Sequence, residues 1–294
     1  MSPTAITLIL IAAIAHASWN LFGKQASATG AVFFTWLMAS LATAAYAPAV
    51  VIAVVWTRPH LTTANWLFMA GTGVLETGYF LFLQTGYRLG DLSVVYPIGR
   101  GTGALLAALA GVVLLGERPG AVALAGIGCI VAGIVVIGLP ARQPPAQRPT
   151  RQPPALVAVA FALGTGVFIA SYTLWDKHAV SALHTPPLLQ GYAAFPVMLV
   201  ALTPIVARDR PRLARVWRSF RAQAIGAALL APFAYILVLA ALSFTAVSAV
   251  APAREISVLF GVLLGRRLLN EGSLPRRLVA AAAIVAGIVA VALG

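Results

Sequence analysis

Four ionisable side chains lie inside stretches of sequence that are otherwise apolar: Glu76, Arg100, Arg254 and Glu255. A charge at the centre of a membrane-spanning helix costs about 2.5–3.5 kcal/mol, so residues of this kind are functional candidates. They could bind a polar substrate, or they could pair with one another, for example Glu76 with Arg100, and hold a helical bundle together. The sequence leaves both interpretations open.

Aromatic and polar side chains accompany these charges at helical spacing. His16, Trp19 and Asn20 lie three and four residues apart, so they share one face of a helix. We predict a substrate-binding site formed by the charged residues and by the aromatic and polar residues near them: His16, Trp19, Asn20, Glu76, Tyr79, Tyr96, Arg100, Tyr172, Trp175, Arg254 and Glu255.

Glu76 and His16 are also candidates for coupling substrate movement to protons, since histidine titrates near physiological pH. His16 could equally be a neutral histidine hydrogen-bonded between helices, and Trp175 could belong to an aromatic belt at the membrane surface. The single cysteine and four histidines show no ligand spacing, so we expect no metal site. No nucleotide-binding loop is present, and we expect no cofactor.

The composition indicates the environment of the chain. Hydrophobic residues make up 61% of it and charged residues only 9%, whereas a soluble domain carries roughly 25% charged residues. The chain cannot cover itself with polar surface, so membrane lipid must be its solvent. The net charge of +13 does not indicate a nucleic-acid partner, because the arginines are spread between apolar stretches and form no single patch.

Ten apolar stretches are long enough to span a membrane, which takes about 20 residues. Their continuous hydrophobicity indicates helices and not the alternating strands of a barrel. The predicted fold is an all-α integral membrane protein with ten transmembrane helices. The expected helices cover Thr4–Phe22, Ala31–Trp56, Asn65–Gln84, Leu92–Leu115, Gly120–Leu139, Leu156–Trp175, Pro187–Ala207, Gln223–Phe244, Val247–Leu264 and Pro275–Leu293.

The chain divides into two related halves, residues 1–139 and 155–294, joined by a Pro/Arg-rich linker over residues 140–154. Five helices per half is an odd number, so the second half must lie in the membrane upside down relative to the first. Two inverted five-helix repeats of this kind suit alternating access around a site near the midplane.

Matching residues indicate that the halves arose by duplication. The only lysines, Lys24 and Lys177, occupy equivalent positions in blocks that align without gaps. Pro97 and Pro252 also correspond, and each lies three residues before a buried charge. Because proline removes a backbone donor, we expect both helices to kink or unwind there.

Several motifs resemble those of the drug/metabolite transporter superfamily, in particular bacterial proteins with two EamA-type repeats. They are Trp19-Asn20-Leu-Phe-Gly-Lys24, Tyr96-Pro97, Leu115-Gly-Glu117-Arg118 and, in the second half, Leu269-Asn-Glu271. The resemblance covers the whole chain and implies a ten-helix basket. Its first, third, fourth, sixth, eighth and ninth helices would line a central cavity, with the fifth and tenth at the periphery. Glu117 and Glu271 would then be structural residues.

The distribution of basic residues and the family resemblance predict opposite orientations of the termini. With termini outside, the cytoplasmic loops hold Lys24, Arg88, the linker arginines, the run Arg208–Arg221 and Arg266–Arg277. The opposite side then holds only Arg58, Arg118 and Lys177, as the positive-inside rule requires. The resemblance implies termini in the cytoplasm.

We expect a secondary transporter that moves a small polar or zwitterionic metabolite by alternating access. The opening His16-Ala-Ser-Trp-Asn20 resembles that of EamA-type proteins found near phosphonate-utilisation genes, so the substrate could be amino-acid-like or aminophosphonate-like. An exporter of drugs or lipid-linked compounds is the alternative within this class. A membrane-embedded enzyme is the alternative outside it, but no nucleophile–base pair is recognisable.

The Ala- and Arg-rich composition is typical of a GC-rich bacterial genome, so we expect a multi-pass protein of the bacterial inner (plasma) membrane. Small residues crowd the fifth and tenth segments, among them Gly126, Gly133 and Gly287. They allow helices to approach closely, either within the chain or between two copies in a homodimer.

Overall fold

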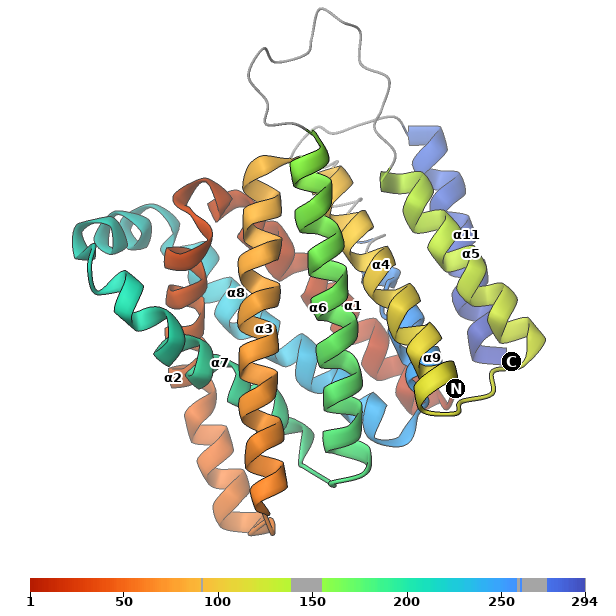
Figure 1. Ribbon diagram of the computed structural model, residues 1–294, viewed down its shortest axis with the longest axis horizontal. Helices are drawn as coiled ribbons and strands as arrows, with labels where there is room; N and C mark the ends of the chain where they lie inside the picture. The colour runs from red at the N-terminus through yellow and green to blue at the C-terminus, as the bar shows by residue number, and fades with distance from the viewer. Residues whose placement is uncertain (91, 139–154, 258–259, 261–273, 294) are drawn as a thin grey trace, which may run out of the picture.

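The computed structural model describes residues 1–90, 92–138, 155–257, 260 and 274–293. This part of the chain is helical and contains no strand (Figure 1). Its helices are α1 (Pro3–Ala26), the short 3₁₀ helix η1 (Ser27–Thr29), α2 (Ala31–Thr57), α3 (Thr63–Leu89), α4 (Leu92–Leu114), α5 (Ala121–Gly138), α6 (Ala155–Ser181), α7 (Pro187–Val206), α8 (Arg210–Phe244), α9 (Val247–Ala253) and α11 (Leu274–Leu293). The predicted linker over residues 140–154 and Glu271 lie outside the described residues.

The lengths and apolar character of these helices confirm the prediction of an all-α membrane protein. Six of them, α1, α2, α3, α6, α7 and α8, are long and apolar enough to cross a membrane. Shorter apolar helices cover Ile98–Leu114, Ala121–Gly133 and Ala282–Val291. The predicted segment Val247–Leu264 is described only in part, through α9 and the few residues that follow it.

Helix α8 differs most from its predicted bounds, because it begins at Arg210 and not at Gln223. The backbone leaves helical geometry at Phe220 (φ −133°, ψ 24°), which divides a basic first part from the apolar span. In the first part Val216 is buried, while Arg215 and Arg218 are exposed. The arginines lower the mean hydropathy, so a search for apolar stretches misses this amphipathic extension.

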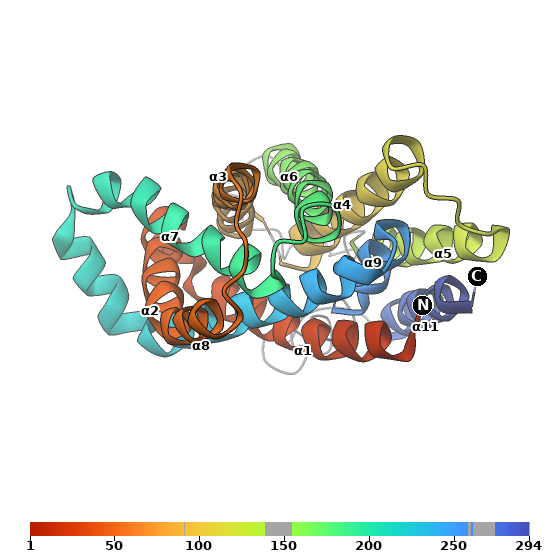
Figure 2. The same ribbon diagram turned by 90° about the horizontal axis from the view of Figure 1, so that it is seen from below.

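Corresponding helices of the two halves run in opposite directions. In Figure 1, α1 and α3 run from the lower edge upward, whereas α6 and α8 run downward. The contacts between helices show the same correspondence. Helix α1 packs against α8, and their counterparts in the other half, α6 and α3, pack against each other. Figure 2 shows α3, α6 and α4 along one face and α1 with α8 along the other, so the core lies between these two layers.

The two lysines perform the same task in each half. Lys24 Nζ lies 3.0 Å from the carbonyl oxygen of Tyr87 and 3.3 Å from that of Gly90, at the end of α3. Lys177 Nζ lies 2.9 Å from the carbonyl oxygens of both Leu242 and Thr245, at the end of α8. An ammonium group there satisfies terminal carbonyls and the negative end of the helix dipole. The duplicated sequence thus produces duplicated capping.

Helices α5 and α11 pack together at one edge of the molecule (Figure 1). A Cβ atom at Gly126 would lie 2.6 Å from the carbonyl oxygen of Gly287, and one at Gly287 would lie 2.5 Å from that of Gly126. The small residues therefore serve close packing within the chain. A homodimer formed through these peripheral helices stays a prediction.

Glu117 connects the two halves at the start of α9. Its carboxylate accepts hydrogen bonds from the backbone N–H groups of Val247 and Ser248, at 2.8 Å each. A carboxylate at a helix N-terminus satisfies orphan donors and complements the dipole. Glu117 is therefore a structural residue, as the family resemblance implies.

We predict that Glu117→Ala lowers the free energy of unfolding by about 1–2 kcal/mol, the usual cost of removing a helix cap. Thermal unfolding of the purified protein would measure the loss. The neighbouring, exposed Arg118→Ala is the matched control and should change stability by less than about 0.5 kcal/mol. Equal stability of the two variants would contradict the capping role.

Candidate functional site

A bidentate ion pair lies at the centre of the described core. Arg100 Nε lies 2.8 Å from Glu255 Oε2, and Arg100 Nη2 lies 2.8 Å from Glu255 Oε1. The two side chains are 1% and 0% exposed. Arg100 belongs to α4 of the first half and Glu255 follows α9 of the second, so the pair joins the repeats. The pairing of Glu76 with Arg100, offered as an example from the sequence, is not found.

The chain breaks its helical course where it supplies Glu255. Helix α9 ends at Ala253, and Arg254 and Glu255 form a turn directly after Pro252 and Ala253. The expectation of an interrupted helix is therefore met in the second half. In the first half the helix does not unwind, because α4 continues through Pro97. That proline lies near the start of α4, where the loss of one backbone hydrogen bond disturbs the helix little.

Two side chains of α1 make polar contacts with neighbouring helices, one with Arg100 of α4 and one with Tyr87 of α3. His16 Nε2 lies 3.1 Å from Arg100 Nη1. Since a guanidinium group only donates, Nε2 must be the acceptor in this contact. One turn later, Asn20 accepts a hydrogen bond from the hydroxyl of Tyr87 at 2.8 Å. His16 and Asn20 thus act as polar links between helices in this conformation.

Two charged groups of the cluster remain without full partners. Arg254 is 3% exposed, and its Nη2 atom has no hydrogen-bond partner in the described part of the chain. Its Nε atom is 3.5 Å from Glu255 Oε1, a weaker contact than the bidentate pair. Glu76 is 4% exposed and makes neither an ion pair nor a hydrogen bond with another described residue.

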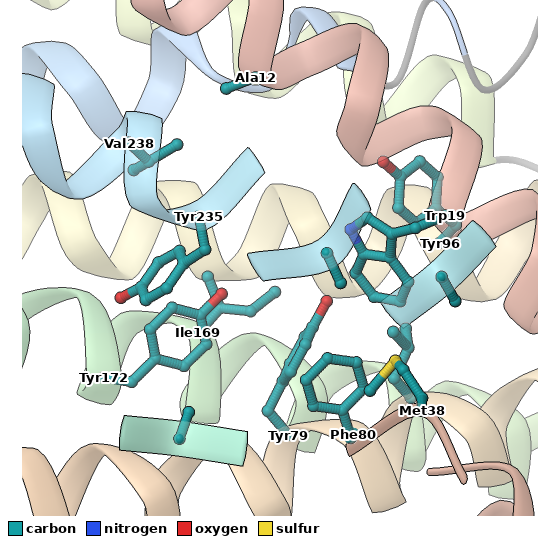
Figure 3. Close-up of a cluster of buried hydrophobic side chains, with 14 of the residues drawn as sticks. Ala12, Trp19, Met38, Tyr79, Phe80, Tyr96, Ile169, Tyr172, Tyr235 and Val238 are labelled. Carbon is teal, nitrogen blue, oxygen red and sulfur yellow. The ribbon is translucent and has the colours of Figure 1, made fainter. Parts of the chain in front are cut away.

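An aromatic row runs across the core beside these charges (Figure 3). Neighbouring ring centroids lie 5.0–5.5 Å apart, in the order His16, Trp19, Phe80, Tyr79, Tyr172 and Tyr235. The hydroxyl of Tyr79 and the indole nitrogen of Trp19 are buried without a partner among the described residues. Tyr96 completes the group, with its hydroxyl 3.2 Å from that of Ser257. The row therefore provides flat apolar ring faces together with polar atoms that have no partner among the described residues.

Ten of the predicted site residues share this core, and Trp175 does not. Trp175 is 36% exposed, stacks on Phe68 at a centroid distance of 4.2 Å and donates to the Phe68 carbonyl oxygen at 2.8 Å. It lies at the outer surface between α3 and α6. This position agrees better with the alternative interpretation, in which Trp175 is an aromatic side chain that faces the membrane, than with a role in the binding site.

The sequence prediction missed a second polar centre around Asp176 of α6. This carboxylate, 0% exposed, accepts hydrogen bonds from the hydroxyls of Thr72 and Tyr235 and from the amide of Gln190. The donors come from α3, α8 and α7. One signal was available, since Asp176 is an acidic residue next to Lys177 in the repeated block. Its partners could not be inferred, because they lie far apart in the sequence, on three different helices.

Helices α1, α3, α4, α6, α8 and the segment after α9 together supply the cluster, as the family resemblance implies. The ten central side chains are at most 8% exposed, so this conformation closes the cluster to solvent. The described residues contain no group of His, Cys, Asp and Glu side chains that could hold a metal ion. The arrangement can bind a small charged molecule if the helices move apart.

Comparison with known proteins gives a family match over nearly the whole chain. The profile of the EamA-like transporter family matches residues 3–139 and again residues 156–293. This confirms the resemblance drawn from the motifs. No match is found among curated proteins. A solved crystal structure is similar over 98% of both chains, with a TM-score of 0.66 and 20% sequence identity, and this likeness concerns the fold alone.

We predict that Arg100→Leu and Glu255→Leu each cost about 3–5 kcal/mol of unfolding free energy, because each leaves a buried charge without its partner. The double variant should cost clearly less than the sum, since it leaves neither charge. Unfolding of the purified protein in mixed micelles would measure all three values. Additive losses would show that the two side chains do not depend on one another.

Proposed function

Because the chain belongs to the EamA-like transporter family, we propose that it is a secondary transporter whose substrate is a small zwitterionic metabolite. The observation that carries the proposal is the pair of buried charges without a full partner in the described core, Arg254 and Glu76. Buried charges without partners are costly, so a ligand that neutralises both would be favoured.

The two charges suit the two ends of a zwitterion. The guanidinium group of Arg254 can hold a carboxylate or phosphonate through two hydrogen bonds. The carboxylate of Glu76 can accept from an amine. Arg100 and Glu255 are less available for these roles, because each already satisfies the other. The aromatic row beside them would bury the apolar part of an amino-acid-like or aminophosphonate-like molecule.

Alternating access would follow from the arrangement of the repeats. The contacts that close the cluster join elements of opposite halves, such as α1 with α8 and α3 with α6. Rocking of one half against the other would open the cluster toward one side of the membrane and then the other. Neither candidate for proton coupling that the sequence offers is free for that role in this arrangement, because His16 is bonded to Arg100 and Glu76 would hold the substrate amine.

The chain is a multi-pass membrane protein of a transporter family, and we place it in the bacterial inner membrane. Arg212, in the basic first part of α8, donates to the carbonyl oxygen of Thr29, so this part lies beside the end of α1 that is remote from the N-terminus. With the basic part in the cytoplasm, the termini face outward, in agreement with the charge distribution. Neither catalysis nor the export of larger apolar compounds is favoured by a specific feature of the described core.

Thermal unfolding of the full-length protein with a ligand panel tests the substrate class. The panel contains α-amino acids, aminoalkylphosphonates and analogues that carry only the acid or only the amine. A zwitterion should raise the stability by mass action, about 2.7 kcal/mol at one hundred times its Kd. Glu76→Gln and Arg254→Gln should each weaken its binding at least tenfold, since one charge partner is lost.

Arg88→Gln is the matched control, because Arg88 is exposed and lies outside the cluster. Its ligand affinity should equal that of the unchanged protein. The proposal is wrong if the single-charge analogues bind as tightly as the zwitterions, or if both site variants fold and keep their affinity.

A further inference from the structure

Asp176 is a buried carboxylate for which the proposed substrate contacts give no role. Its oxygens accept from three neutral donors, Thr72, Gln190 and Tyr235, and no ion pair to it is found in the described ranges. The donors hold it firmly between four helices. Neutral donors stabilise the ionised form, but they do not cancel its charge.

Among the described residues, the buried charged groups of the core contain one negative charge more than they contain positive charges. Arg100 and Arg254 supply two positive charges, whereas Glu76, Asp176 and Glu255 supply three negative ones when all are ionised. An uncompensated charge is expensive where water is excluded. A single proton on one carboxylate balances the group. Glu255 is the poorest acceptor for this proton, because it holds Arg100 through both oxygens.

Asp176 has a ready partner for such a proton. The Thr72 hydroxyl has two acceptors within reach, Asp176 Oδ1 and the carbonyl oxygen of Phe68 at 3.0 Å, and only one hydrogen. When Asp176 takes up a proton on Oδ1, it can donate to Thr72 Oγ1, while the Thr72 hydrogen turns to Phe68. The Gln190 amide, 2.7 Å from Thr72 Oγ1, keeps an acceptor in both states. Glu76 is assigned to the substrate amine in the proposed function, which leaves Asp176 for the proton.

We propose that Asp176, with the Thr72 hydroxyl as its switchable partner, is the proton-binding site of this transporter and is separate from the substrate-binding charges. The proton comes from water on the side to which the core is open. The proton converts the carboxylate to the neutral acid. The only other change is that the Thr72 hydroxyl turns from Asp176 to the carbonyl oxygen of Phe68. The inference rests on the proposed function, because it names the group that carries the coupling ion.

The surroundings of Asp176 contain few other titratable groups. Glu76 faces it from α3, Tyr235 from α8, Tyr172 from its own helix and Arg254 from the segment after α9. From α7 the neighbour is Gln190, which does not titrate. The adjoining Lys177 is turned away toward the end of α8. Tyr235 contacts Tyr172, and the Arg254 guanidinium lies 5.9 Å from the Tyr172 ring, so protonation of Asp176 can influence a substrate charge through these side chains.

Infrared spectroscopy of the full-length protein in lipid vesicles tests the proposal without any substrate. A protonated carboxylic acid gives a carbonyl band that the ionised form lacks, and this band is followed as the pH is changed. The titrating band should disappear in Asp176→Asn. It should persist in Glu76→Gln and in the matched control Asp209→Asn, whose carboxylate caps α8 outside the core.

Two further variants keep the carboxylate and cover the case in which Asp176→Asn does not fold. Thr72→Val and Tyr235→Phe each remove one donor and should change the pH at which the band appears. The control Thr85→Val should leave this pH unchanged, because the Thr85 hydroxyl bonds only within its own helix, to the Leu81 carbonyl.

A band that survives Asp176→Asn, or is lost only in Glu76→Gln, overturns the proposal. So does a band that responds to sodium at constant pH. Ligand binding by Arg254 and Glu76 would remain a separate result.

Discussion

The cost of burying charge in a lipid-embedded core is the constraint from which the described arrangement follows. Arg100 and Glu255 meet this cost by pairing through two contacts of 2.8 Å. One partner comes from each half, so this pair joins the two repeats. The ion pair therefore fixes how the repeats face each other, and it orients Arg254, the neighbour of Glu255, toward the aromatic row beside Tyr172. Charges left over from this pairing are the ones available to a ligand or a proton.

Other contacts support the helices around this centre, some within one half and some between the halves. The lysines end α3 and α8 in the same manner, and Glu117 fixes the start of α9. Glycines let α5 and α11 cross closely at the edge. The lysine contacts lie within one half each, so they can persist while the halves move, whereas the contacts of Glu117 and of α5 with α11 join the halves. The polar links of the core are side-chain contacts, which can be exchanged for contacts with a ligand.

The helices could be predicted from the sequence because their main determinant, apolar length, is local. The basic extension of α8 was missed because its arginines hide its apolar stripe from a hydropathy search. That the charged residues lie together in the core could also be predicted, since an ionisable residue inside an apolar segment is conspicuous. Its pairing could not. Which acid meets Arg100 depends on how two repeats are rotated and stacked, and spacing along the chain does not record this. For the same reason the partners of Asp176, on α3, α7 and α8, were out of reach, and Trp175 was placed in the site although it faces outward.

The central claim is that the buried cluster opens to water on each side of the membrane. Ser257→Cys in a Cys129→Ser background tests this most directly, since Ser257 is 0% exposed beside Tyr96 and the change is nearly isosteric. The measurement is the rate at which a small, membrane-impermeant thiol reagent modifies the introduced thiol from either side of sealed vesicles. The account predicts modification from both sides, slowed by a bound ligand. A thiol that reacts from neither side in the folded protein, but reacts after unfolding, would mean that the cluster is a sealed structural core.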